Sequence, residues 1–258
     1  MDIDQSKLMD CIRTNALSGS FLNPSGGMLD VNDTTGGGMA WHFSFDDGNA
    51  GTNGAALYAT NYAVEISNGS CIGVTGACTN SALTQVKGLT VASNQQIYLR
   101  GNYNDVNKKP AAVLADAINI LSSAVAAGAA GDIKKTLTPA TATTVNAAFL
   151  SGIDTTVPGW SYNGGLQNYP RLHENWGGAI FTYRGSFVSL GNSVHVQGLQ
   201  ACAYLSDGVT QAACGVGTYY GAPTRNWDYD TSFNDVNNLP PLTPRFVYLR
   251  QLLFARTY

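Results

Sequence analysis

The chain has 258 residues and a formal net charge of −3, and only 12% of its residues are charged, about half the usual share. Just two of the 17 acidic residues are glutamates, Glu65 and Glu174, whereas 29 residues are glycine. Because Glu and Lys favour helix surfaces while Gly, Asn and Asp favour turns, this composition indicates a turn-rich β protein. The lack of a basic excess argues against a nucleic-acid partner, and no apolar stretch of the sequence is long enough to span a membrane.

The length suits a single domain, since β domains of this size often stay undivided, and we expect residues 1–258 to form one β-rich domain. The first ten residues, MDIDQSKLMD, lack the basic region and apolar core of a signal peptide. The composition is nevertheless typical of exported proteins. The chain is either a cytosolic protein or a mature or excised portion of a longer chain. We favour the second and expect a location outside the cell or on its surface.

In chain order, residues 6–16 predict a short helix, and a glycine-rich loop follows at 23–38. Residues 39–45 predict a clear strand, because Trp41 and Phe43 alternate with polar neighbours and so share one face. This segment is the first well-marked strand of the chain.

Brief apolar strands broken by single turn residues dominate residues 57–103. Ile97 and Leu99, for example, alternate with polar neighbours between Asn94 and Gly101. Such strands are unusual in hairpin sheets but suit a β-solenoid, in which the chain bends at each corner without reversing. We predict a mainly β fold, a short-stranded β-solenoid of the right-handed β-helix type; a β-sandwich is the alternative.

Residues 110–128 have the spacing of an amphipathic helix, and Pro110 suits its first turn. Thr138 then caps a second short helix that extends through Leu150. We expect these helices to form one helical insertion at about 106–150, which covers an apolar sheet face in either fold. The expected apolar stripe consists of Leu114, Ala117, Ile118, Leu121 and Val125.

Strands return between residues 179 and 199, flanked by an aromatic-rich loop at 151–178 and a second loop at 200–244; the apolar run 246–254 predicts a last strand. Aromatic rings in such loops suit the faces of sugars or of a protein partner. Arg171 and Glu174 either take part in this surface or form an internal ion pair that braces the loop. The predicted surface-contact residues are Trp160, Tyr169, Arg171, Glu174, Trp176 and Trp227.

Four of the five cysteines form two local couples, Cys71 with Cys78 and Cys202 with Cys214, and Cys11 is left over. Each couple brackets a loop-like segment, so a disulfide in each would stabilise it by roughly 2–3 kcal/mol. Free buried thiols are the alternative. Zinc is not expected, because neither CxxC nor histidine spacing accompanies the cysteines.

Calcium is the best cofactor candidate. Asp228, Asp230 and Asp235 place hard oxygen ligands close together in one acidic turn, although the segment lacks the glycine and the glutamate of an EF-hand loop. Turn formation is the alternative role for these carboxylates. No other cofactor is expected, because the glycine-rich segments follow no strand and end in no Lys-Ser/Thr pair.

No histidine lies in a metal spacing or beside a nucleophile motif, and no carboxylate pair stands out, so we predict no catalytic residue. Several strings together resemble the C-terminal region of large bacterial surface proteins, which often carry a PilX-like N-terminal segment and belong to the type IV pilus setting. The resemblance covers roughly residues 15–258 and implies export and a role on or outside the cell. The strings lie at 88–104, 109–122, 146–150, 168–176, 223–227 and 239–244.

The favoured function is therefore a non-enzymatic structural or adhesive domain of the cell surface, associated with a pilus or filament. Its expected partners are other copies of itself, pilus or surface subunits, or a glycan. A polysaccharide-active hydrolase or lyase on a β-solenoid is the first alternative, since solenoid grooves suit glycan chains. A calcium-dependent adhesion module is the second.

Overall fold

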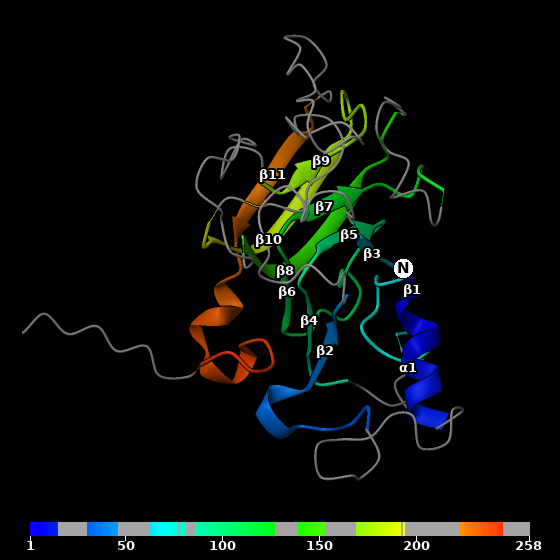
Figure 1. Ribbon diagram of the computed structural model, residues 1–258, viewed down its shortest axis with the longest axis vertical. Coiled ribbons are helices and arrows are strands. Elements are labelled where there is room, and N and C mark those ends of the chain that lie inside the picture. Colours follow the sequence, from blue (N-terminus) through cyan, green and yellow to red (C-terminus); the bar gives the residue numbers. More distant parts are fainter. Residues whose placement is uncertain are drawn as a thin grey trace, which may run out of the picture.

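Over the residues that it describes, the computed structural model has two β-sheets of parallel strands and one α-helix (Figure 1). The helix, α1 (Gln5–Thr14), confirms the short helix expected near the start of the chain. No helix in the described part of the chain has the length and apolar character needed to cross a membrane. The structure describes residues 1–14, 30–45, 62–76, 78–80, 86–126, 139–152, 169–191, 193 and 222–244.

Consecutive strands from β1 to β10 alternate between the two sheets, so most strands pair with the strand two positions further along the chain. The five-stranded sheet has the order β1 (Asp2–Asp4), β3 (Ala63–Ser67), β5 (Gln96–Arg100), β7 (Ile118–Leu121) and β9 (Arg171–Leu172). The six-stranded sheet has the order β11 (Thr224–Tyr229), β10 (Ile180–Ser189), β8 (Thr143–Ser151), β6 (Ala111–Leu114), β4 (Leu89–Ser93) and β2 (Met39–Phe43). Over the described strands neither sheet closes on itself.

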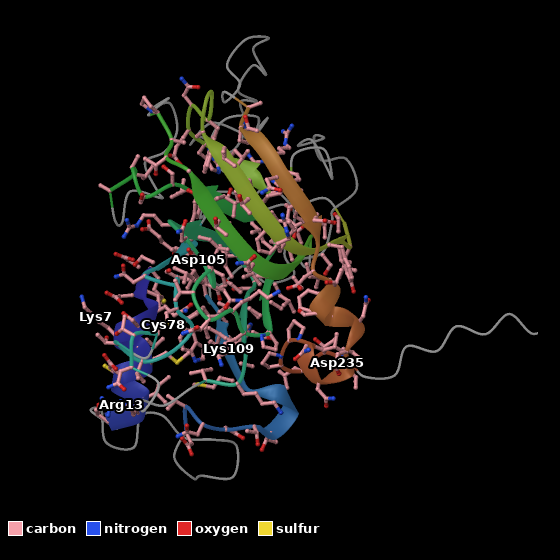
Figure 2. The ribbon with its side chains drawn as sticks, turned by 180° about the vertical axis from the view of Figure 1, so that it is seen from behind. Lys7, Arg13, Cys78, Asp105, Lys109 and Asp235 are labelled. Carbon is pink, nitrogen blue, oxygen red and sulfur yellow. A yellow bond between two sulfur atoms is a disulfide. The ribbon has the colours of Figure 1, made fainter. Side chains whose placement is uncertain are left out.

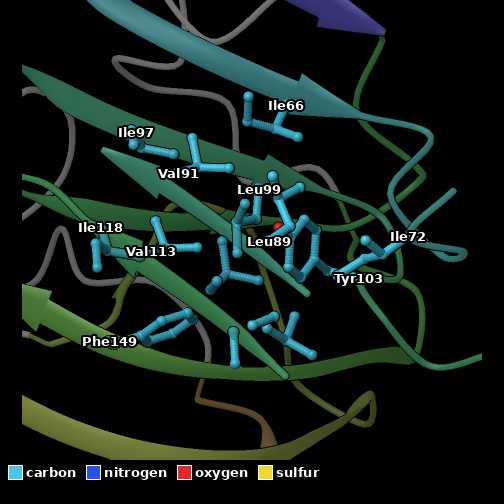
Figure 3. Packing of buried hydrophobic residues seen from close by; sticks show 14 of the residues in the cluster. Ile66, Ile72, Leu89, Val91, Ile97, Leu99, Tyr103, Val113, Ile118 and Phe149 are labelled. Carbon is cyan, nitrogen blue, oxygen red and sulfur yellow. The ribbon is translucent and has the colours of Figure 1, made fainter. Parts of the chain in front are cut away.

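The core lies between the sheets, where apolar side chains from equivalent strand positions stack in columns (Figure 3). Because side chains alternate across a strand, the residues that face inward from one strand meet their register partners on the next. One column runs along the six-stranded sheet through Trp41, Val91, Val113, Phe149 and Phe187. Another runs along the five-stranded sheet through Ile66, Leu99, Ile120 and Leu172.

The helical insertion expected at about 106–150 is wrong in the described part of that range. Residues expected in the long helix form β6 and β7, separated by a corner at 115–117, and those expected in the second helix form β8. The apolar spacing at 114, 117, 118 and 121 fits a helix face as well as two short strands. Pairing with β4 and β5 decides between them, because long-range packing overrides weak local preference.

Other expected elements agree more closely with the structure. The strand expected at 39–45 is β2, with Trp41 buried and Ala40 exposed as the alternation predicts. The segments expected separately within 179–190 form one long strand, β10, and the loop expected at 200–244 contains β11. The strand expected at 246–254 lies outside the described residues.

At Gly185, β10 and its neighbour β8 approach closely. A Cβ atom at this position would collide with the carbonyl oxygen of Ala147 in β8 and with the hydroxyl of Tyr183, which itself donates a 2.7 Å hydrogen bond to that oxygen. Only a residue without a side chain fits here.

We predict that Gly185→Ala lowers the free energy of unfolding by about 1–3 kcal/mol, because the strands must separate to admit the methyl group. Ser186→Ala, one residue further along β10 on the opposite face, is the control and should change it by less than about 0.5 kcal/mol. Urea titration followed by tryptophan fluorescence measures both variants. Equal stability of the two variants would contradict the close approach.

Candidate functional site

The outer face of the six-stranded sheet is lined by small and apolar side chains at equivalent strand positions. Because each position is the register partner of the next, they form two rows across β2, β4, β6, β8 and β10. The first row consists of Ala40, Thr90, Ala112, Ala148 and Ser186, and the second of His42, Ala92, Leu114, Leu150 and Val188. A sheet face of this composition offers contact rather than chemistry.

A segment that we call the strap, residues 230–244, crosses this face after β11. It contains two short 3-10 helices, η4 (Thr231–Asn234) and η5 (Val236–Asn238), and lies on the opposite side of the molecule from α1 (Figure 1). Figure 2 shows Asp235 on the strap, beyond the end of β11.

Two hydrogen bonds hold the far end of the strap against the sheet. Thr90 Oγ1 donates to the Pro241 carbonyl oxygen at 2.7 Å, and the Leu242 N–H donates to the Gly36 carbonyl oxygen at 2.9 Å. The strap therefore passes beside the start of β2, the outermost described strand of this sheet.

A groove of about 620 Å³ lies between the strap and the sheet face. We call it the outer groove; its floor is formed by the two rows, and its wall by Tyr229, Phe233 and residues 239–244. Among the described residues that line it, His42 and Tyr229 are titratable and none carries a carboxylate. Such a lining favours an apolar ligand held by surface contact, because general acid–base catalysis needs placed proton donors and acceptors.

The near end of the strap is fixed by an ion pair between Lys108 and Asp230. Lys108 Nζ lies 2.8 and 2.7 Å from the two carboxylate oxygens of Asp230, which is 6% exposed. The same carboxylate accepts hydrogen bonds from the backbone N–H and hydroxyl of Ser232 and so caps η4. Burial would raise the pKa of Asp230, but these hydrogen bonds outweigh it and hold the pKa below its ordinary value.

The three predicted calcium ligands take part in an ion pair and in turns. Asp230 is bound to Lys108, Asp235 caps η5 through the Asn237 N–H at 2.9 Å, and the exposed Asp228 accepts from the Tyr229 N–H. Within the described ranges, no group of three His, Cys, Asp or Glu side chains is placed to hold a metal ion. These carboxylates order turns, as Asp does at helix N-termini, and calcium binding stays a prediction.

Three of the predicted contact residues, Arg171, Glu174 and Trp176, are buried, so the expectation that they form a contact surface is wrong. Glu174 accepts hydrogen bonds from the Ser122 N–H at 2.6 Å and from its hydroxyl at 2.5 Å. The Trp176 ring packs 5.7 Å from that of Phe181. The loop around 171–176 therefore braces the core.

The other predicted contact residues differ from one another. Trp227 is half-buried in β11, where its ring packs 5.6 Å from Phe181 and Arg225 lies 5.2 Å from its centroid. Tyr169 is half-buried against Phe149. Trp160 lies outside the described residues. Of this group, only Trp227 lies on an exposed strand.

The outer face of the five-stranded sheet carries a buried row of polar side chains. Glu65, Tyr98, Asn119 and Arg171 are successive register partners, and each is at most 4% exposed. Glu65 forms a 2.8 Å ion pair with Arg100. Buried charges of this kind need partners, and here they join neighbouring strands.

His173 extends this buried polar row. Its Nε2 lies 2.7 Å from Oδ1 of Asn119, and burial together with the nearby Arg171 lowers the pKa of His173 to about 3. The imidazole is therefore neutral at physiological pH. Because the amide oxygen of Asn119 can only accept, Nε2 carries the proton and donates to it.

Cys71 and Cys78 lie at disulfide distance, with Cα atoms 6.0 Å apart, in agreement with the predicted couple. The loop closed by this couple is hydrogen-bonded to a later part of the chain, since Asn107 Nδ2 donates to the Cys78 carbonyl oxygen at 3.2 Å. Cys11 is a half-buried free thiol in α1. Cys202 and Cys214 lie outside the described residues.

No protein-family model, curated protein or solved structure matches the chain. The sequence analysis does not predict the outer groove. Its signal in the sequence is the run of small residues at alternate strand positions, and the helical spacing of residues 110–128 hides that signal in β6. The description of the outer groove as a site therefore depends on its geometry alone.

We predict that Asp230→Asn lowers the free energy of unfolding at pH 7 by about 1–3 kcal/mol, because a charged hydrogen bond is lost while the cap remains. The pKa of Asp230 is lowered in the folded state, so its contribution is present at neutral pH and disappears as the pH falls through that pKa. The difference between wild type and variant should therefore shrink in acid. Urea titrations at pH 7 and below pH 4 measure it, with the exposed Asp228→Asn as control.

A second prediction concerns the buried imidazole. The unfolded chain takes up a proton at His173 near pH 6.5, whereas the folded protein does so only near pH 3, so acid favours unfolding. This group should remove roughly 1.4 kcal/mol of stability per pH unit between about pH 6 and pH 4. His173→Gln should flatten that slope in urea titrations, whereas His42→Gln, at an exposed position of β2, should leave it unchanged.

Proposed function

We propose that this protein is an exported, non-enzymatic structural or adhesive domain of the cell surface, associated with a pilus or filament. The observation that carries the proposal is what the charged side chains contact and what lines the outer groove. Among the described ion pairs, Glu65–Arg100 joins β3 to β5, Lys108–Asp230 fixes the strap, and the other two are local pairs at α1, while the outer groove is mostly apolar. Such a molecule is equipped to hold surfaces together rather than to transform a substrate.

The architecture that we propose is a β-solenoid. Support comes from strands that alternate between two parallel sheets, in register, with corners as short as residues 94–95. A solenoid presents unpaired backbone groups at both ends, which suits end-to-end association with further copies of the same chain. In the described part of the six-stranded sheet, those ends are β2 and β11.

Export is supported by the cysteine couple at disulfide distance, because disulfides persist in oxidising compartments. The resemblance to the C-terminal region of pilus-associated surface proteins points the same way. A polysaccharide-active enzyme would need two carboxylates that converge beside an aromatic ring. Glu174, close in sequence to Trp176, is instead buried and bonded to Ser122.

Strand β11 offers a direct test of self-association. It is exposed along most of its length, and the N–H groups of Thr224 and Asp230 point to β10. Because backbone groups alternate, the N–H of Arg225 points away from β10, toward the free edge of β11. Proline at this position removes a donor that a second copy would use and leaves the pairing with β10 intact.

We predict that the purified chain self-associates as its concentration rises. Arg225→Pro should weaken this self-association at least about tenfold. The control Arg225→Ala keeps the N–H group and should retain the self-association. Light scattering with negative-stain microscopy measures assembly, and surface biotinylation of intact host cells measures location. A chain that stays monomeric at every concentration, labels only after lysis and cleaves a glycan would contradict the proposal.

A further inference from the structure

The outer groove offers exposed apolar side chains on both its floor and its wall. Val188 and Leu242, which line it, are 44% and 67% exposed, and Tyr229 is 46% exposed. Large apolar side chains that lie exposed together in a groove mark a binding site. The volume of about 620 Å³ falls within the range of small-molecule pockets, about 300–1,000 Å³. The chemical class of the ligand follows from the groups that line the groove.

The described lining leaves few hydrogen-bonding groups for a ligand. Backbone N–H and C=O groups of the floor strands point along the sheet toward neighbouring strands, not into the groove. The Thr90 hydroxyl donates to the Pro241 carbonyl oxygen, and the three prolines of the wall, at 240, 241 and 244, have no N–H group. A peptide strand or a glycan would therefore bury polar groups without partners, which is unfavourable. The lining favours a ligand without polar groups along its length.

The length of the floor matches a single hydrocarbon chain. Its five paired strands cover about 19 Å at their usual spacing. One acyl chain of a lipid spans half of the hydrocarbon core of a bilayer, or about 15 Å. An extended acyl chain therefore fits across the floor, from β2 to β10.

His42 gives this floor one polar end. The second row begins at the exposed His42 in β2 and ends at Val188 in β10, with aliphatic side chains between them. A ring N–H of the imidazole can donate a hydrogen bond to a carboxylate. Since none of the described lining residues carries a carboxylate, none of them repels an acidic head group. The row therefore suits a hydrocarbon chain that ends in a carboxylate.

We infer that the outer groove binds a free long-chain fatty acid, with its hydrocarbon chain along the second row and its carboxylate at His42. The strap is tied to the rest of the molecule at both ends, through Asp230 and through Pro241, so the wall is in place before binding. A preformed wall lowers the cost of ordering on binding. The inference rests on the proposed function only in treating the groove as a contact surface rather than a reaction site.

Calorimetric titration of the purified full-length chain tests the ligand class. Hexadecanoate and octanoate are compared, each below its micelle concentration. We expect saturable binding of one hexadecanoate per chain, at least about tenfold tighter than that of octanoate, because each further buried methylene adds hydrophobic stabilisation. Absence of saturable hexadecanoate binding overturns the inference, and so does equal affinity for the two chain lengths.

A matched pair of variants in β10 tests the location. Val188→Asp places a charge on the groove floor that would lose its hydration against the hydrocarbon chain, and it should weaken hexadecanoate binding at least about tenfold. Ile180→Asp adds the same charge at a 48% exposed position of the same strand, outside the groove lining, and should change the affinity less than about twofold. Thermal unfolding of both variants checks that they fold. Unchanged binding by folded Val188→Asp overturns the assignment to the groove.

Replacement of His42 tests the orientation of the fatty acid. His42→Leu removes the hydrogen bond to the carboxylate but keeps apolar contact, so it should weaken decanoate binding at least about threefold. Binding of 1-decanol, which has no carboxylate, should change less than about twofold. An equal effect on both probes would contradict the placement of the carboxylate at His42. Surface location and self-association are measured separately, so failure of the proposed function can be told apart from failure of fatty-acid binding.

Discussion

Stacking of apolar side chains between parallel strands in register is the interaction on which the rest of the structure depends. Val91, Val113 and Phe149 lie over one another because their strands pair without offset, and a slip of one residue would turn this column outward. The same pairing forces the chain to change sheets through short corners, which leaves no room for a helix between β6 and β7.

The outer faces of the two sheets carry different kinds of side chain, and the proposed function depends on this difference. On the five-stranded sheet, polar and charged side chains are buried and bonded to neighbouring strands, as Glu65 is to Arg100. On the six-stranded sheet, small and apolar side chains form the floor of a groove whose wall is fixed by Lys108 and Asp230. Ion pairs therefore join parts of the scaffold, and the mostly apolar groove is the surface that the proposed function would use for contact.

The sequence predicts strands best where alternation is strong and a turn follows, as in β2, and it predicts α1 well because a short amphipathic run has no competing interpretation. The sequence-based prediction fails at β6 and β7. Leu114 and Ile118 fit a helical period, and only pairing with distant strands decides between a helix and two strands. The same reasoning placed Trp176 and Glu174 on the surface, because aromatic and charged residues in a loop look exposed until tertiary contacts bury them. The groove could not be predicted, since its floor combines residues from five strands.

The in-register stacking itself can be measured by nuclear Overhauser effects on a methyl-labelled, full-length sample. The account predicts contacts from the Val113 methyl groups to those of Val91 and to the ring of Phe149. It also predicts, over residues 111–121, strong sequential contacts between the amide proton of each residue and the α-proton of the residue before it. A helix would instead give contacts between residues three and four apart in that segment, such as Leu114 with Ile118. Observation of the helical pattern, with no contact between Val113 and Phe149, would contradict the account.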